Sequence, residues 1–246
     1  MNTYYETEDT RNLLIKNAFA VFQKSVTLSN IHISLSHRND YVIKASRNGF
    51  KYPIDITFHM LSSTKCFLPK EFSNKKVGDN ILINLPFKVC SSDASYEYIN
   101  VVYETLNSKI SDFFKGSIED GSIYRISNFY KESDGSIIIE LDLKCVMCKN
   151  KKTGSLFVGY YDMLTSVKTI SWDQSKNIYV ESQINYDKLN LLFSMSNQNY
   201  AECTVSLDSF RIFNNDSLSN INLKWFIKSI KILTSMKPED EIQTDV

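Results

Sequence analysis

Alternation of apolar and polar residues dominates this 246-residue chain, and it is clearest between residues 134 and 162. The segment opens on the turn signal Asp134-Gly135, and alternation then runs from Ser136 to Cys148. A basic loop, Lys149 to Gly154, separates it from a second alternating run, Leu156 to Tyr161. Because a period of two places successive side chains on opposite faces of a strand, the segment predicts one long β-hairpin.

The same pattern predicts strands along most of the chain. In the run after residue 200, Cys203, Val205 and Leu207 share one phase, whereas Phe210 and Ile212 take the other, which indicates a β-bulge near Asp208-Ser209. Further strands are expected at residues 30–36, 41–46, 54–60, 81–89, 123–131, 164–172, 177–184, 189–195 and 201–213.

Three segments show helical spacing instead. The clearest is 92–114, where Ile99, Val102, Leu106 and Ile110 form one apolar stripe behind a cap at Ser92 or Asp93. Residues 9–25 also fit a helix, with a strand over 19–26 as the alternative. Residues 217–236 fit strand alternation as well as helical spacing, and their length favours a helix.

Charge is balanced overall but uneven along the chain. The 28 basic and 28 acidic residues give a net charge of zero. Without the first and last ten residues, 27 basic and 21 acidic residues remain, so the body is basic and both ends are acidic. A basic body suits a nucleic-acid binder whose acidic tail competes for its own site, although charged chain ends are also common in proteins of other kinds. The tail carboxylates, which we expect to contact a partner, are Glu239, Asp240, Glu241 and Asp245.

The sequence predicts an intracellular protein that is not secreted. The acidic start MNTYYETEDTRN has no apolar core of a signal peptide, and no stretch approaches the roughly 18 apolar residues of a membrane span. The five cysteines are an odd number and are expected to be reduced thiols.

No pattern of catalytic or metal-binding residues stands out. Cys145 and Cys148 would point to opposite faces of a strand, and no second pair is available to complete four zinc ligands. Glu140 and Asp142 share one face of the predicted strand, where a solvated surface is the simpler interpretation. We therefore expect a non-enzymatic protein without a metal or a cofactor.

Nucleic-acid binding is the remaining candidate, because single-strand binders combine cations along the backbone path with rings that stack on bases. The hairpin and the strand before it have that composition. In the predicted strands Phe157 and Tyr161 share one face and Tyr160 takes the other, so both sets cannot be exposed. The alternative is that the rings fill the core and the lysines solubilise the hairpin tip. The candidates are Lys144, Lys149, Lys151, Lys152, Phe157, Tyr160 and Tyr161 in the hairpin, and Tyr124, Arg125, Tyr130 and Lys131 before it.

The order of these elements resembles a known family. The chain presents a strand ending near proline (ILINLPF), a crossing helix (SSDASYEYINVVYETLNSKISDFF), a DG turn, a KNKKTG loop, a strand ending in YYD, and then VESQINY, AECTVSLDSFRIF and an acidic tail. This order is similar to that of the OB-fold single-stranded-DNA-binding proteins of tailed phages and some large DNA viruses. In that family a helix interrupts a small barrel, a lysine-rich loop joins two long strands, and an acidic C-terminus contacts replication proteins.

The resemblance implies a mostly β protein of viral or phage replication. We expect an OB-like barrel or sandwich with one inserted helix and flanking N- and C-terminal helices. Residues 1–80 would pack on a barrel domain of residues 81–236, and residues 237–246 would form the tail. The family implies a DNA-binding role for the Lys149 to Lys152 loop and a partner-binding role for the tail. Two alternatives stay open: a viral structural or assembly protein built on a β-sandwich, and an enzyme or ligand binder whose site a single sequence does not reveal.

Overall fold

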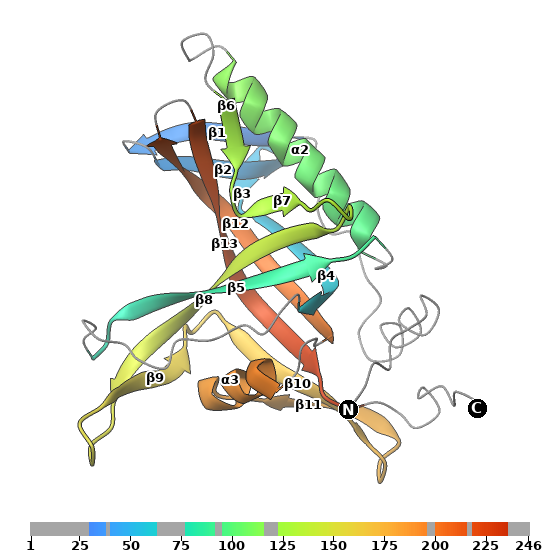
Figure 1. Cartoon of the computed structure of the whole chain (residues 1–246), viewed down its shortest axis with the longest axis vertical. Helices are drawn as coiled ribbons and strands as arrows, with labels where there is room; N and C mark the ends of the chain where they lie inside the picture. Colours follow the sequence, from blue (N-terminus) through green and yellow to red (C-terminus); the bar gives the residue numbers. More distant parts are fainter. Residues whose placement is uncertain are drawn as a thin grey trace.

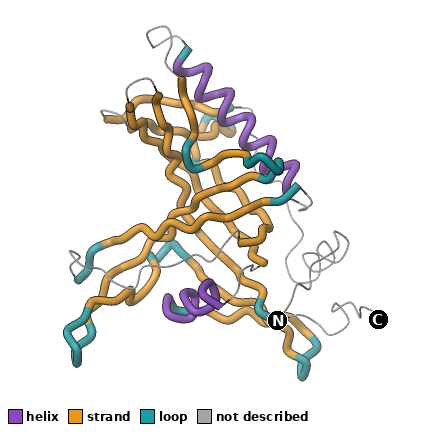
Figure 2. The backbone as a smooth tube through the Cα atoms, viewed as in Figure 1, coloured by secondary structure: helices purple, strands orange, loops and turns teal. Residues whose placement is uncertain are grey.

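The computed structural model describes residues 30–37, 40–62, 77–91, 95–115, 123–195, 200–215 and 218–235. These residues form a 13-stranded mixed sheet and two helices (Figures 1 and 2). The helix expected over residues 9–25 and the acidic tail lie outside them. The elements are β1 (Ile31–His37), β2 (Asp40–Arg47), β3 (Phe50–Tyr52), β4 (Ile54–Ser62), β5 (Asn80–Val89), α2 (Tyr96–Phe114), β6 (Ile123–Ile126), β7 (Phe129–Lys131), β8 (Ile137–Lys149), β9 (Leu156–Tyr161), β10 (Ser166–Asp173), β11 (Ile178–Gln183), α3 (Tyr186–Met195), β12 (Tyr200–Asn215) and β13 (Leu218–Leu233).

Five of the strands close into a ring. β4 pairs with β5, β5 with β8, β8 with β13, β13 with β12, and β12 returns to β4. Only the β8–β13 pair is parallel; the other four are antiparallel. Closure gives each ring strand a partner on both sides, which removes free sheet edges from this part of the molecule.

The parallel pair that closes the ring is a crossing point. β8 and β13 meet at one register position, Asp142 opposite Phe226, and then diverge, as their paths in Figure 1 show. Before the crossing, β6 pairs with β13 and β7 with β8; after it, β9 pairs with β8 and β10 with β13. Two short connections therefore lie between β8 and β13 where these strands diverge. Ser127-Asn128 joins β6 to β7 before the crossing, and the turn Asp162–Thr165 joins β9 to β10 after it.

Asn128 bridges β8 and β13 before the crossing. It is 4% exposed, and its side-chain amide donates to the Leu223 carbonyl (2.6 Å) and accepts from the Leu223 N–H (2.9 Å). Its own carbonyl accepts from the Glu140 N–H (2.9 Å). One residue thus satisfies backbone groups of both β8 and β13 where the two strands cannot reach each other.

The two helices lie at opposite ends of the sheet (Figure 1). α2 buries Ile99, Val102, Leu106 and Ile110 at helical spacing, and its last turn packs Phe114 against Tyr41, Tyr124 and Phe210. α3 buries Leu189 and Phe193, and the Phe193 ring lies 6.3 Å from that of Phe87 on β5. Neither helix is long and apolar enough to cross a membrane.

The structure confirms the long hairpin, the helix within 92–114, and the bulge near Asp208, where the β12–β13 register shifts between Leu207 and Phe210. The helix starts at Tyr96, with Ser95 at its N-cap making no side-chain capping bond, so the predicted cap at Ser92 or Asp93 does not begin it. The mostly β class is also confirmed.

Three predicted elements are wrong. Residues 218–233 form the strand β13 and not a C-terminal helix, because Ile221, Leu223, Trp225 and Ile227 all enter the core on one strand face. The strand predicted over 189–195 is part of the helix α3, whose first turn is capped by Asn185 through its side-chain oxygen and the Lys188 N–H (3.0 Å). The single strand expected over 123–131 is split into β6 and β7 at Asn128.

We predict that Asn128→Ala destabilises the fold by about 2–4 kcal/mol, because it leaves the buried Leu223 N–H and carbonyl without partners. Urea denaturation measures this loss. Asn107→Ala, on the exposed face of α2, is the control and should change stability by less than about 0.5 kcal/mol. Equal stabilities of the two variants would contradict this role of Asn128.

Candidate nucleic-acid interface

The β8–β9 hairpin packs its inner face near α3 and presents two aromatic rings to solvent on its outer face. Phe157 is 40% exposed and Tyr160 is 55% exposed. Phe157 lies opposite Cys148 and Tyr160 opposite Val146, on the face of β8 that does not enter the core. Both rings therefore lie on one outer face of the hairpin.

This arrangement differs from the predicted one and has a clear cause. The register of β8 and β9 shifts between Val146 and Met147, so Gly159 is an extra residue in the ladder. The bulge changes the phase of the strand and places Tyr160 on the same face as Phe157, while Tyr161 turns inward. Gly159 is needed there because a Cβ atom at this position would lie 2.7 Å from the Cβ of Cys148.

Three lysines surround the tip of the hairpin. Lys149, Lys151 and Lys152 are exposed, and no described carboxylate forms an ion pair with them. The loop that carries them is ordered by Asn150, whose side-chain oxygen accepts from the Lys152 N–H (2.8 Å) and whose carbonyl accepts from the Gly154 N–H (2.8 Å). The ordered loop therefore carries three exposed lysines close together in the chain, and none has a carboxylate partner in the described part of the chain. Other lysines pair with carboxylates: Lys88, Lys131, Lys168, Lys228 and Lys231.

A fourth cation lies at the base of the same face. The Lys144 ammonium sits 3.8 Å from the centroid of the Phe226 ring, directly after the crossing of β8 and β13. A cation over an aromatic face is attracted by the ring quadrupole, so Phe226 fixes the position of this side chain. We call the set of Lys144, Lys149, Lys151, Lys152, Phe157 and Tyr160 the hairpin surface.

Two carboxylates limit this surface: Asp142 lies at the crossing itself and Glu140 lies beyond it. Glu140 and Asp142 share the outer face of β8, and Asn84 of β5 hydrogen-bonds to both. Burial raises the pKa of each carboxyl, and the neighbouring Asp142 raises the pKa of Glu140 further. This pair is half-buried and is not the fully solvated strand face that the sequence suggested.

Tyr161 is not on the hairpin surface. It is 9% exposed, and burial raises the pKa of its hydroxyl, which faces Cys145, Tyr186 and Asp187. Its ring packs in the core near α3 and is not available for stacking on a base. Cys145 is also in the core, where burial raises its pKa to about 12, whereas Cys148 is on the outer face.

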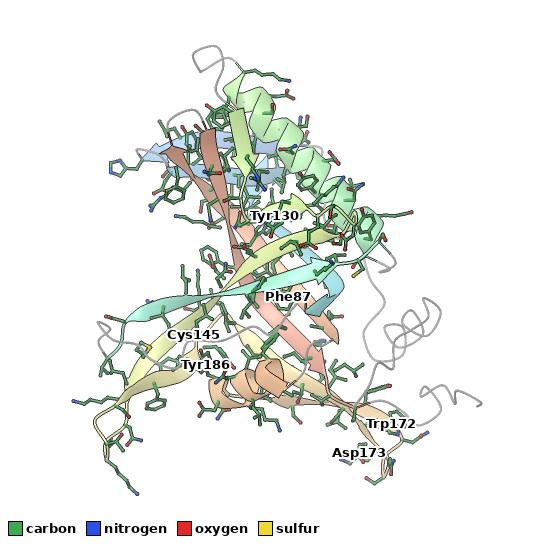
Figure 3. The ribbon with its side chains drawn as sticks, in the orientation of Figure 1. Phe87, Tyr130, Cys145, Trp172, Asp173 and Tyr186 are labelled. Carbon is green, nitrogen blue, oxygen red and sulfur yellow. The ribbon has the colours of Figure 1, made fainter. Side chains whose placement is uncertain are left out.

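The candidates before the hairpin lie elsewhere. Tyr130 pairs with Ile138 near α2, whereas Cys145 lies in the hairpin, as Figure 3 shows. Lys131 forms an ion pair with Glu104 of α2 (2.5 Å), and the Tyr124 ring stacks on that of Phe114 (4.9 Å). Arg125 is exposed on β6, opposite Asn220. The structure therefore does not bring these four residues together with the hairpin surface.

Leu82 and Val77 beside the hairpin surface, and Phe226 beneath Lys144, were missed in the sequence. Leu82 is 57% exposed opposite Lys144, and Val77 is 58% exposed beside Cys148, where it helps to line a shallow hollow with the loop of Lys149 to Gly154. Leu82 had a recognisable signal, because it is apolar at an outward position of the alternating run ILINLPF. Phe226 had none, because its cation partner comes from a distant strand. Within the described residues, no group of His, Cys, Asp and Glu could hold a metal ion.

We predict that Gly159→Ala destabilises the protein by about 1–3 kcal/mol, because the new methyl group collides with the Cys148 Cβ atom in a fixed strand pair. Thermal unfolding measures the loss. Adding Cys148→Gly to the same chain removes the collision and should recover part of that loss. If the double variant is less stable than Gly159→Ala by the full effect of Cys148→Gly alone, the collision is not the cause.

Comparisons with known proteins give a match to a solved structure. No family model and no curated protein matches the chain. Among solved structures, the chain is similar to the crystal structure of gp2.5, a single-stranded DNA binding protein encoded by bacteriophage T7, at 12% sequence identity and a TM-score of 0.35. The match covers 79% of this chain and 98% of that chain. That protein is a phage single-stranded-DNA-binding protein, the kind of protein that the order of elements resembles.

Proposed function

We propose that the chain is a non-enzymatic protein that binds single-stranded DNA through the hairpin surface. The supporting observation is that three lysines without described carboxylate partners surround a hairpin whose bulge turns Phe157 and Tyr160 to the same outer face. Lysines would contact phosphates and the rings would stack on bases, a combination that binds single strands with little sequence preference.

The charges also suggest a direction for the bound strand. Lys144 and Lys149 are five residues apart on β8, a distance of about 17 Å at the rise of a β-strand. The half-buried Glu140 and Asp142 lie beyond Lys144 and would repel phosphates. We therefore infer that the strand runs from the crossing outward to the tip of the hairpin.

We infer further that the five-stranded ring is an OB-type barrel. Counted from β4, its second and third strands are β5 and β8, and in OB folds the face of these two strands binds nucleic acid. Leu82 of β5 and Lys144 of β8 lie opposite each other on that outer face. Under this assignment α2 is an insertion between the second and third ring strands.

A second candidate is a structural or assembly role, which one exposed surface favours. Phe50 and Tyr52 of β3 are 67% and 51% exposed beside the β1–β2 hairpin, and β1 is the last strand on that side of the sheet. Another copy of the chain could pair there. Light scattering behind size-exclusion chromatography separates the two proposals, because an assembly role requires a large closed particle without nucleic acid.

The acidic tail would act as a competitor for the hairpin surface and as a contact for replication proteins. Deleting residues 237–246 removes four carboxylates and one lysine. We predict that the deletion tightens binding to oligo-dT in a fluorescence-anisotropy titration, because the carboxylates no longer compete with phosphates. Weaker binding after the deletion would show that the tail does not compete.

Replacing Lys149, Lys151 and Lys152 by Ala should weaken binding to oligo-dT and lower the slope of log affinity against log salt by about 2, since each phosphate contact contributes roughly 0.7 for single strands. The melting temperature should hardly change, because the three side chains are exposed. Salt-titrated anisotropy measures the slope.

The matched control replaces three exposed lysines by Ala: Lys109 on α2, Lys115 directly after it, and Lys176 in the β10–β11 turn. It changes the net charge by the same amount and should leave the slope nearly unchanged. Wild-type protein that is folded but does not bind oligo-dT at low salt would remove the proposed function. Equal losses in both triple variants would mean that binding depends on net charge and not on the hairpin.

A further inference from the structure

The turn between β9 and β10 exposes an apolar pair. Met163 is 95% exposed and Leu164 is 84% exposed, more than any other large apolar side chain among the described residues. Single exposed apolar residues are common on protein surfaces. Two adjacent ones at the tip of a tight turn, next to a proposed binding surface, suggest a contact that is made only with a partner.

Hydrogen bonds at both ends hold this turn. Within it, the Thr165 N–H donates to the Asp162 carbonyl (2.8 Å) and the Leu164 N–H donates to the Asp162 side chain (3.0 Å). Outside it, the Asp162 N–H donates to the Lys144 carbonyl (2.9 Å), and the Thr165 hydroxyl donates to the Ile227 carbonyl (3.2 Å). The turn is therefore anchored to β8 and β13 and is ordered before any ligand arrives.

Those anchors place the pair at the base of the hairpin surface. The Lys144 carbonyl accepts from Asp162, and the ammonium of the same lysine lies over the Phe226 ring. The Ile227 carbonyl accepts from Thr165, and Ile227 follows Phe226 directly in β13. Tyr160 precedes the turn by two residues and faces outward. The apolar pair thus lies in a turn bonded to the strand that carries Lys144 and close in the chain to the exposed Tyr160 ring, and no acidic side chain other than Asp162 lies within the turn.

We propose that Met163 and Leu164 form an apolar wedge that contacts the bases of the bound single strand at the crossing of β8 and β13. This inference rests on the proposed function and names the part of the site that recognises bases there. Lys144 holds a phosphate, and the pair packs against the apolar face of the neighbouring base or inserts between two bases, as apolar side chains do in other DNA-binding proteins. A strand emerging from the hairpin surface would be unstacked at this point.

The wedge makes a prediction that the lysines do not. Met163→Ser with Leu164→Ser should weaken binding to oligo-dT about tenfold, with the slope against salt unchanged, because no phosphate contact is lost. The melting temperature should also stay unchanged, since both side chains are exposed. The matched control is Val101→Ser with Ile178→Ser, two exposed apolar residues on α2 and β11, which should bind like the wild type.

The outcomes separate the wedge from the proposed function. If the wild type binds with a steep salt slope and the Met163/Leu164 variant binds equally well, the wedge is overturned and the proposed function stands; the pair would then serve another partner. If the variant loses salt slope, it disturbs Lys144 and the wedge is also overturned. If the wild type does not bind at all, the proposed function is overturned, and the wedge that rests on it is overturned as well.

A measurement on the wild-type protein avoids any effect of substitution on folding. Oligo-dT that contains 4-thiothymidine is cross-linked by light to the bound protein, and the adducts are mapped by mass spectrometry. The wedge predicts adducts within residues 162–165. Fragmentation of the cross-linked peptide assigns each adduct to a residue. Adducts on Phe157 and Tyr160 without any on the turn would contradict the wedge.

Discussion

The single backbone pairing position of β8 and β13 decides the architecture of this protein. The ring closes only there, at Asp142 and Phe226, and both strands then continue with other partners. Backbone groups left without partners at such a crossing would be costly, because they are buried. Asn128 on one side and the Asp162–Thr165 turn on the other supply the missing hydrogen bonds. The crossing is therefore maintained by two short connections and not by a continuous ladder.

The same crossing determines where a ligand could bind. Because β8 parts from β13 after Asp142 and stays paired with β5 only as far as Val146, its last residues and β9 project as a hairpin (Figure 1). The Gly159 bulge then turns Tyr160 to that face. Before the crossing, on the side of β6 and β7, Asn128, Glu140 and the buried face of α2 are engaged in packing and hydrogen bonds. The inner face of β8 thus belongs to the core along its length, and the outer face of its last residues belongs to the proposed interface.

Local patterns in the sequence predicted the elements that depend on local order. The hairpin, the helix of residues 96–114 and the bulge near Asp208 follow from alternation, helical spacing and a change of phase. The errors arise where long-range packing decides. Residues 218–233 are a strand because they pair with β12 along their length, and Tyr161 is buried because Gly159, an ordinary strand residue in the sequence, bulges against Cys148. Lys144 and Phe226 come from distant strands, so no single-sequence pattern joins them.

The most direct test is the footprint of oligo-dT on the folded protein, measured by amide chemical-shift changes in a titration at low salt. The changes should concentrate between residues 144 and 165, with little change in β1, β2 and β3. Their amplitude should decrease as salt is added, because phosphate contacts release counterions. Changes confined to β1–β3, or none at low salt, would contradict binding at the hairpin.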